Sequence, residues 1–183
     1  MTVWNIPLYG GWFFLIIFVI TNLILMAVYP KHFSQRLFTM PRFNSKEEFI
    51  PSLLYALLFN ATLVYSIFLP FRPTSIGFIV GAVIYLISLI LFVRSLSNYA
   101  TTSPDQPVTK GVYAYSRHPQ QILATTMWIG CGVATGSMLL ILACIGALLL
   151  SIPSMKVQER FCLEKYGVEY STYLKRTPRF FLC

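Results

Sequence analysis

Five long apolar stretches, separated by polar segments, dominate the pattern of the chain. The first covers residues 10–29, and the others cover about 49–70, 76–96, 120–135 and 138–155. A helix of about 20 apolar residues crosses the hydrocarbon core of a bilayer. The pattern therefore predicts an all-α, polytopic membrane protein with about five transmembrane helices.

The last two apolar stretches lie very close together in the sequence. Only Thr135, Gly136 and Ser137 separate them. A short cluster of Gly, Ser and Thr between two apolar segments is typical of a turn, and two helices joined by so short a turn pack antiparallel. We therefore predict that these two helices form a tight helical hairpin.

A polar tail follows the fifth stretch. Five of its residues recur at alternating steps of four and three: Glu159, Leu163, Tyr166, Tyr170 and Tyr173. This spacing places them on one face of a helix, so we expect a C-terminal cytosolic amphipathic helix. Gly167 weakens the middle of that helix, because Gly is a poor helix former.

Composition supports the membrane class. Only 11% of the 183 residues are charged, against about 25% in soluble proteins. We interpret the net charge of +8 as the excess of Lys and Arg that cytoplasmic loops of membrane proteins carry. Nucleic acid is therefore not an expected partner. Because the first 30 residues carry no charge, they lack the positive region of a signal peptide, and we expect the first stretch to remain as a transmembrane helix.

The cysteines predict neither a metal site nor a disulfide framework. Cys131, Cys144, Cys162 and Cys183 form no CxxC pair and have no His partner at the spacing of zinc ligands. No metal is therefore expected in the function of this protein.

Charged residues are distributed unevenly between the polar segments. Every Lys and Arg except Arg72 falls in or beside the first loop, the third loop or the tail, and so does every Asp and Glu. Cytoplasmic loops carry an excess of Lys and Arg. We therefore predict a multi-pass protein whose N-terminus lies outside and whose C-terminus and polar chemistry lie in the cytosol. The Lys and Arg residues on that side are Lys31, Arg36, Arg42, Lys46, Arg94, Lys110, Arg117, Lys156, Arg160, Lys165, Lys175, Arg176 and Arg179.

The polar segment TKGVYAYSRHPQQI, at residues 109–122, lies between two apolar stretches. Pro119 suits the first turn of the following helix, because its missing N–H would have had no partner there. His118 would then lie at the helix N-terminus, where N–H groups and the helix dipole favour an anionic group. Alternatively, His118 only caps the helix, and Tyr113 and Tyr115 belong to the aromatic belt of the membrane surface.

Two segments in this half of the chain resemble a known family. PVTKGVYAYSRHPQQ contains the pattern Gly-x-Tyr-x-x-x-Arg-His-Pro, and QERFCLEKYGVEYSTYLKRTPRFF contains an acid, an aromatic-Gly pair, Tyr-x-x-Tyr and a terminal Arg. Both resemble the isoprenylcysteine carboxyl methyltransferase and phospholipid methyltransferase superfamily, in which the first pattern precedes a helical hairpin. The resemblance covers roughly residues 95–181.

The resemblance implies an integral membrane methyltransferase that uses S-adenosyl-L-methionine. Its cofactor pocket would face the cytosol and would be formed by the third loop, the last two spans and the tail. We expect a single membrane domain over residues 1–183, with the first three transmembrane helices in 1–94 and a cofactor-binding methyltransferase core in 95–183.

The matching positions imply particular site residues. The implied cofactor-binding residues are Val108, Tyr113, His118, Pro119, Glu159 and Tyr170. The implied catalytic residues are Arg117 and Glu159, with Arg179 shaping the pocket or pairing with a carboxylate. The chain departs from the family at two positions: it has Gln121 where the family usually has an aromatic residue, and Gln158 where the family has the first acid of a pair. These departures concern the methyl acceptor more than the cofactor.

Methyl transfer from a sulfonium is an in-line displacement, so the protein mainly aligns donor and acceptor and excludes water. Glu159 would accept hydrogen bonds from the ribose hydroxyls or the amino group of the cofactor, His118 would donate to its carboxylate, and tyrosines would cover the adenine. The acceptor would be a lipophilic or small molecule with a carboxylate, a thiol or an amine. An amine must lose a proton, which requires Glu159 or water as a base.

Two other functions compete with this interpretation. Membrane sterol reductases that use NADPH carry a related Arg-His segment and a Tyr-rich tail, although they are generally longer. A transporter or membrane scaffold is the non-enzymatic alternative, but a transport pathway requires ionisable residues within the spans. The sequence has none within residues 10–29, 49–70, 76–93 and 120–155. It does not indicate an oligomeric state.

Overall fold

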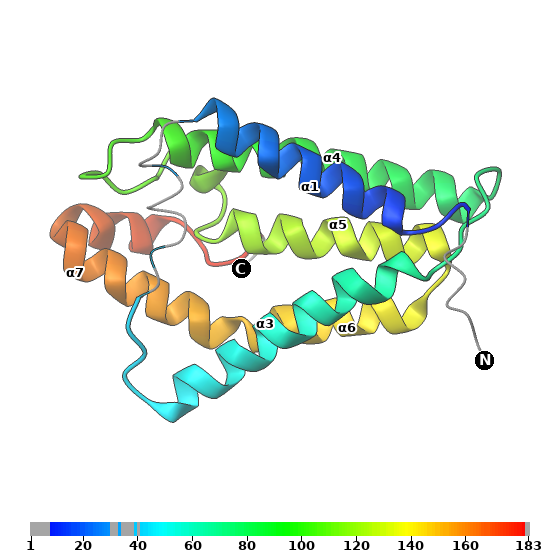
Figure 1. Cartoon of the computed structure of the whole chain (residues 1–183). Coiled ribbons are helices and arrows are strands. Elements are labelled where there is room, and N and C mark those ends of the chain that lie inside the picture. The colour runs from blue at the N-terminus through cyan, green and yellow to red at the C-terminus, as the bar shows by residue number, and fades with distance from the viewer. Residues whose placement is uncertain (1–7, 30–32, 34–38, 40, 182–183) are drawn as a thin grey trace.

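The structure is a computed structural model that describes residues 8–29, 33, 39 and 41–181. Within these ranges the chain forms helices and no β-strand, as the sequence predicts (Figure 1). Lys31, Arg36 and Cys183 lie outside the described residues. The helices are α1 (Trp12–Val28), α3 (Lys46–Ile67), α4 (Ile76–Thr101), the short 3-10 helix η1 (Gly111–Ala114), α5 (Pro119–Thr135), α6 (Met138–Leu150) and α7 (Ile152–Arg176).

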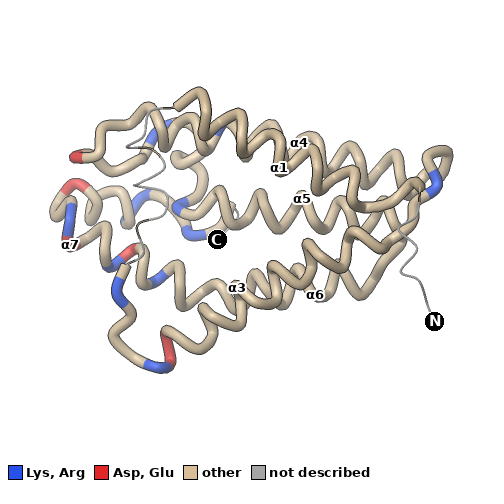
Figure 2. Tube along the Cα trace, viewed as in Figure 1, with Lys and Arg blue, Asp and Glu red and all other residues tan. Residues whose placement is uncertain are grey.

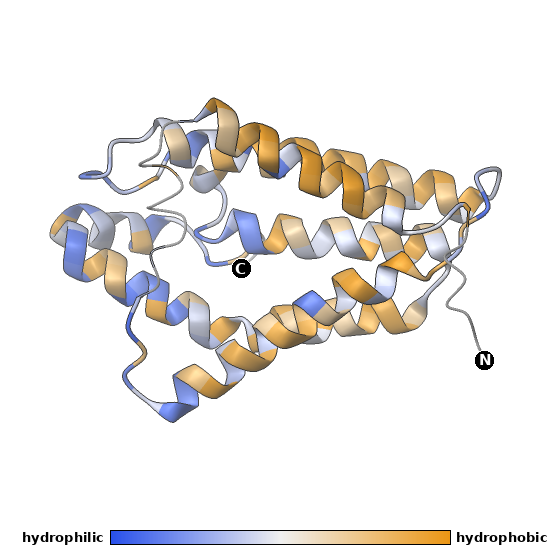
Figure 3. Ribbon diagram, viewed as in Figure 1, coloured by the Kyte–Doolittle hydropathy of each residue, from blue (hydrophilic) through white to orange (hydrophobic). Residues whose placement is uncertain are grey.

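Several helices have the length and composition of membrane spans. Three helical stretches in the described part of the chain are long and apolar enough to cross a membrane: α3, α4, and the continuous stretch of α6 and α7. The helix α1 is a shorter apolar helix of 17 residues. Figure 3 shows hydrophobic residues along α1, α4 and α6, whereas polar residues concentrate in α7 and the connections near it. The chain is therefore a helical membrane protein.

The most extensive helix interface joins α4 and α5. Gly81 on α4 faces Gly130 on α5, and a Cβ atom at Gly81 would collide with the backbones of Gly130 and Ala134. Small residues let membrane helices approach closely and gain van der Waals contact. The absence of a side chain at Gly81 therefore lets α4 pack closely against α5.

The helices α5 and α6 form the predicted hairpin. Gly136 ends α5 with a φ of +71°, a left-handed conformation that glycine adopts without a steric penalty. Ser137 then begins α6, and its hydroxyl accepts a hydrogen bond of 3.2 Å from the N–H of Leu140. The hairpin brings the start of α5 and the end of α6 to the same end of the molecule, where α7 lies (Figure 1).

The helix α7 is kinked at Gly167, which has a φ of 56° and a ψ of −125°. The kink confirms the weak point that the sequence predicts and divides the predicted helical face. Glu159, Tyr170 and Tyr173 are buried, whereas Leu163 is exposed. The regular spacing in the tail therefore corresponds to two shorter faces rather than to one continuous face.

Charged side chains gather at one end of the helices. Figure 2 shows Lys, Arg, Asp and Glu concentrated around α7 and the connections beside it, with little charge at the opposite end. At the charged end, Arg160 of α7 donates two hydrogen bonds, of 2.6 and 3.0 Å, to the carboxylate of Glu48 on α3. Arg160 also donates to the carbonyl of Arg42. The ion pair between Arg160 and Glu48 connects α7 to the start of α3.

Candidate functional site

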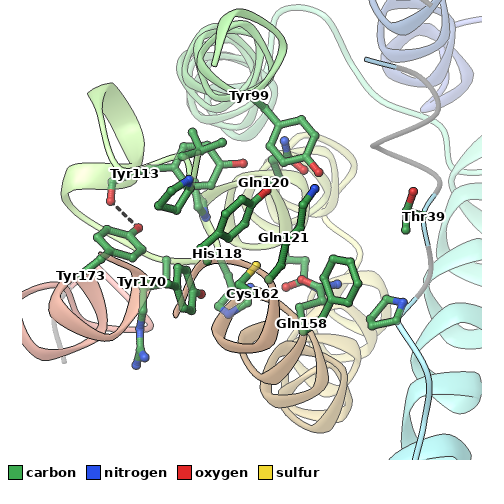
Figure 4. Close-up of a pocket in the computed structure, with 18 residues that line it drawn as sticks. Thr39, Tyr99, Tyr113, His118, Gln120, Gln121, Gln158, Cys162, Tyr170 and Tyr173 are labelled. Atoms are coloured by element: carbon green, nitrogen blue, oxygen red, sulfur yellow. Dashed lines mark hydrogen bonds between the residues drawn. The ribbon is translucent and has the colours of Figure 1, made fainter. Parts of the chain in front are cut away.

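A cavity of about 240 Å³ lies at the charged end of the helices. It is slightly smaller than the roughly 300–1,000 Å³ typical of small-molecule sites. Thr39 and Pro41 line it from the segment after α1, Tyr99 lines it from α4, and the remaining lining residues come from 107–121 and from α7. Figure 4 shows these side chains meeting from separate elements. Segments that are distant in the sequence thus build one concave site.

Most of the residues implied by the sequence motifs meet at this cavity. The ones that line it are Val108, Tyr113, Arg117, His118, Pro119 and Tyr170. Glu159 is not among the lining residues that the structure describes, but its carboxylate contacts the His118 ring. The structure therefore brings the implied residues together, and their roles toward a ligand stay a prediction.

Several lining residues escaped the sequence reasoning. Thr39 and Pro41 belong to the first loop, which no motif marks, and Tyr99 and Phe161 lie in helices whose sequences do not set them apart. Gln120 also lines the cavity, and its place directly after Pro119 is the one signal that could have identified it.

The connection before α5 is fixed by hydrogen bonds to its neighbours. Gly111 has a φ of +64°, and a Cβ atom there would collide with the side chain of Asn98. The side-chain oxygen of Asn98 accepts a hydrogen bond of 3.3 Å from the N–H of Val112. The hydroxyl of Tyr173 donates to the carbonyl of Tyr113 over 2.7 Å. These contacts hold Tyr113 at the cavity wall.

The residues before His118 are bound to the C-terminal segment. The hydroxyl of Ser116 donates to the carbonyl of Arg179 over 2.7 Å, and the N–H of Arg117 donates to the carbonyl of Pro178 over 3.0 Å. The N–H of His118 donates to the hydroxyl of Ser116 over 3.2 Å. The backbone of the Arg-His pair is therefore fixed beside Arg179.

His118 lies at the N-terminus of α5 but does not cap it through its side chain. Pro119 is the first residue of α5, as the sequence predicts, and no side-chain hydrogen bond from His118 caps the helix. Instead, Nε2 of the buried His118 ring lies 3.1 Å from Oε1 of Glu159 on α7. His118 therefore occupies the N-cap position of α5, and its side chain contacts Glu159 instead of capping the helix.

The carboxylate of Glu159 forms ion pairs with positively charged side chains at the cavity. Arg179 donates from Nε to Oε1 over 3.0 Å and from Nη2 to Oε2 over 2.7 Å, which is a bidentate ion pair. Nη1 of Arg117 lies 3.4 Å from Oε1 of the same carboxylate. Because Glu159 is only 8% exposed, these contacts are shielded from solvent.

The contacts of Glu159 determine its protonation state. Burial alone would raise the pKa of Glu159, but hydrogen bonds from His118 and Arg179 outweigh burial and lower the pKa to about 2. Burial lowers the pKa of His118, although the hydrogen bond to Glu159 opposes this shift. A neutral His118 beside a carboxylate must carry its proton on Nε2, which leaves Nδ1 as a hydrogen-bond acceptor.

The cavity lining carries positive charge. Arg117 and Lys165 line the cavity, and no Asp or Glu is among the described lining residues. The carboxylate of Glu159, which contacts the lining residues His118 and Arg117, is already paired with Arg179. The cavity therefore offers positive charge to an anionic group such as a carboxylate.

These features define a class, that of helical membrane proteins with a polar, aromatic cavity at their charged end. The family model for phospholipid methyltransferases matches residues 74–169, just over half of the chain. The chain therefore belongs to the phospholipid methyltransferase family, a family of membrane methyltransferases, in agreement with the superfamily that its two motifs resemble. The comparisons with curated proteins and with solved structures gave no significant match.

Proposed function

We propose that the protein is an S-adenosyl-L-methionine-dependent methyltransferase embedded in the membrane. It transfers a methyl group to a lipophilic or small acceptor at the cytosolic face. The observation that carries this proposal is the convergence of Tyr113, Arg117, His118 and Pro119 on one cavity, within the range that matches the methyltransferase family. Members of such families generally use S-adenosylmethionine.

The residue types in the lining suit this cofactor. The rings of Tyr113 and Tyr170 offer aromatic surface to an adenine. Nε of Arg117 is buried without a hydrogen-bond partner, so it is available to donate to the carboxylate of the cofactor. Nδ1 of His118 would accept from the amino group of the cofactor. Val108 and Pro119 complete the proposed cofactor-binding set.

We assign Glu159 and Arg179 to positioning rather than to direct contact with the cofactor. Glu159 holds the His118 ring by its Nε2 atom and holds Arg179 by a bidentate pair. Because the Nε2–H group of His118 donates to Glu159, it is not available to donate to the carboxylate of the cofactor. Arg117 therefore takes this donor role, which the sequence predicted for His118. Arg117 remains the proposed catalytic residue, because it lines the cavity.

The charges around the cavity also favour one kind of acceptor. Bound S-adenosylmethionine supplies an electrophilic methyl group: a lone pair of the acceptor forms the new bond to carbon, and sulfur keeps the electrons of the broken S–C bond. A carboxylate or thiolate attacks without losing a proton, whereas an amine needs a base. With a pKa of about 2, Glu159 is a poor base. A carboxylate or thiolate beside Arg117 and Lys165 is therefore favoured over an amine.

The proposed arrangement in the membrane follows from the distribution of charge. We assign α1, α3, α4, α5 and α6 as five transmembrane helices. The third of them, α4, extends to Thr101 and so overlaps the beginning of the proposed methyltransferase core in 95–183. The charged end and the cavity would face the cytosol, the N-terminus would lie outside, and α7 would lie at the cytosolic surface. The concentration of Lys and Arg at one end supports this orientation (Figure 2).

The proposal is tested by binding of S-adenosylhomocysteine, the product form of the cofactor, to the protein in mild detergent. We expect binding by isothermal titration calorimetry, and at least about a fivefold loss of affinity in His118→Ala, because a buried hydrogen-bonding side chain costs about 1–3 kcal/mol when it is removed. Tyr115→Ala is the matched control, because Tyr115 is 69% exposed and does not line the cavity.

A folded wild-type protein that does not bind S-adenosylhomocysteine would contradict the proposal. Titration with NADPH under the same conditions then tests the reductase alternative. Equal loss of affinity in Tyr115→Ala would show that the connection as a whole, and not His118, is sensitive to substitution.

A further inference from the structure

Besides Nε of Arg117, two buried polar atoms of described residues at the cavity have no hydrogen-bond partner. They are Nε2 of Gln120, which is a donor, and Oε1 of Gln121, which is an acceptor. Both residues lie in the first turn of α5 and line the cavity, and Figure 4 shows them among the lining side chains. Buried polar groups in proteins are nearly always hydrogen-bonded. An unpaired donor and an unpaired acceptor on neighbouring residues therefore indicate a ligand group that offers both partners.

The parts of S-adenosylmethionine differ in the partners that they need. Its amino acid part is charged and is matched by ionic groups such as Arg117. Its ribose hydroxyls are commonly bound by a carboxylate, which the described lining lacks. Adenine is neutral and planar, and its edges carry an amino donor beside a ring-nitrogen acceptor. A glutamine amide commonly reads the amino group of adenine together with a ring nitrogen beside it, which is N7 in the DNA major groove.

We propose that Gln120 and Gln121 recognise the adenine edge of the cofactor, an inference that rests on the proposed methyltransferase function. Oε1 of Gln121 accepts a hydrogen bond from the 6-amino group, and Nε2 of Gln120 donates to N1, the ring nitrogen that carries a proton in hypoxanthine. The aromatic rings of Tyr99 and Phe161 line the same cavity and add to the aromatic surface that Tyr113 and Tyr170 offer the flat base.

This assignment also explains a departure from the family pattern. The resemblance places an aromatic residue two positions after the motif proline, where this chain has Gln121. An aromatic ring would contribute surface for stacking but could not accept a hydrogen bond from the 6-amino group through an amide oxygen. Gln121 is therefore a residue that distinguishes cofactor recognition in this chain, rather than a substitution that weakens the site.

The test compares two ligands that differ only in the base. S-inosyl-L-homocysteine carries an oxygen in place of the 6-amino group of S-adenosylhomocysteine and a protonated neighbouring nitrogen, so donor and acceptor are exchanged. A bidentate contact to a base discriminates by about 1–3 kcal/mol, which corresponds to roughly 5- to 150-fold in affinity. We expect the wild type in detergent to bind the adenine ligand at least about fivefold more tightly by calorimetry.

Variants then assign the discrimination to the two glutamines. Gln121→Met and Gln120→Met keep the length of the side chain and remove the amide. Each should bind S-adenosylhomocysteine more weakly and lose most of the preference for adenine. Gln158→Met is the matched control, because Gln158 lines the same cavity from α7 and should leave the preference unchanged. The unfolding temperature of each variant shows whether it is folded.

The outcomes separate this inference from the function on which it rests. If the wild type binds both ligands equally, or if folded Gln120→Met and Gln121→Met variants keep the preference for adenine, the inference is wrong while the methyltransferase proposal stands. If a folded variant loses the two ligands to the same extent, the glutamine contacts a different part of the cofactor and the inference is again wrong. Failure of the wild type to bind S-adenosylhomocysteine counts against the proposed function itself.

Discussion

A single carboxylate organises the side chains around the cavity. Glu159 accepts hydrogen bonds from Arg179 and His118, and Arg117 lies within 3.4 Å of it. Replacing a buried ion pair by apolar residues is often neutral for stability, but removing one member leaves the other charge uncompensated and costs about 3–5 kcal/mol. The role of Glu159 is therefore to position the His118 ring and the guanidinium groups of Arg117 and Arg179.

The substitution Glu159→Gln tests this role. We expect a loss of about 2–3 kcal/mol in the free energy of unfolding, somewhat below the range for fully buried pairs because Arg179 is partly exposed. Affinity for S-adenosylhomocysteine should fall as well, because His118 and Arg117 lose their common partner. Denaturant titration and calorimetry in detergent measure the two effects. Glu164→Gln, an exposed position on the same helix, should change neither quantity.

The lowered pKa of Glu159 also sets the pH range of its contribution. Its pKa falls from 4.5 to about 2 on folding, so the unfolded chain binds the proton more readily. The stabilisation is therefore complete above about pH 4.5 and is lost as the pH falls toward 2. The variant Glu159→Gln should show a smaller loss of stability across this range, and an unchanged pH dependence would contradict the ion-pair role.

Much of this site could be predicted from local sequence. The position of Pro119 in the first turn of α5 and of His118 directly before it follows from the chemistry of helix starts. The partners of Glu159 could not be predicted in the same way, because His118 lies 41 residues before it and Arg179 lies 20 residues after it. Spacing along a helix says nothing about side chains that meet only through tertiary packing.

At the scale of helices, the close contact between α4 and α5 helps to fix the position of the residues that line the cavity. His118 and the two glutamines lie in or beside the first turn of α5, so the position of that turn depends on how closely α5 packs against α4. Gly81 and Gly130 set this distance, because their backbones are in direct contact. The positions of the proposed cofactor residues therefore depend on a glycine contact that lies further along the same helices.

The substitution Gly81→Ala measures the importance of this close contact. A Cβ atom there meets the backbone of α5, so we expect a loss of about 1–3 kcal/mol in the free energy of unfolding, the usual cost of overpacking. Gly146→Ala is the matched control, because Gly146 also lies within an apolar helix but its nearest neighbour, a Leu58 methyl group, would be 3.8 Å away. Alanine there should be neutral or stabilise by up to about 1 kcal/mol.

Denaturant titration of both variants in the same detergent gives the comparison. Equal stability of the two variants would show that α4 can move away from α5 without cost. In that case the glycine contact would not determine the position of the cofactor residues.

The helices themselves were largely predictable from the sequence, because each apolar stretch has its own length and its own turn signals. The hairpin at Gly136 and Ser137 is the clearest example, since a left-handed glycine and a serine cap suffice to define it. The bond between Arg160 and Glu48 was not predictable, because 112 residues separate the two in the sequence. The pattern predicts which segments are helical, whereas the side chains between helices decide which surfaces meet.

At the scale of the whole molecule, the separation of charge gives the protein two different ends. The cavity lies at the charged end, while the turn between α3 and α4 carries a single Lys or Arg residue, Arg72. Anionic acceptors and a charged cofactor would reach the cavity from that charged end. The charge distribution therefore supports the proposed orientation, in which the charged end with its cavity would face the cytosol.

Trypsin, which cleaves after Lys and Arg, can test this orientation in sealed vesicles. Arg72 precedes Pro73, and trypsin does not cleave that bond, so an N-outside chain has no cleavage site in this turn. We expect wild-type protein to stay intact in right-side-out vesicles and to be cleaved in inside-out vesicles. Thr74→Lys places a cleavable residue at an exposed position of the same turn and should be cut from the outside. Cleavage of the wild type from the outside would reverse the proposed orientation and place the cavity on the other face of the membrane.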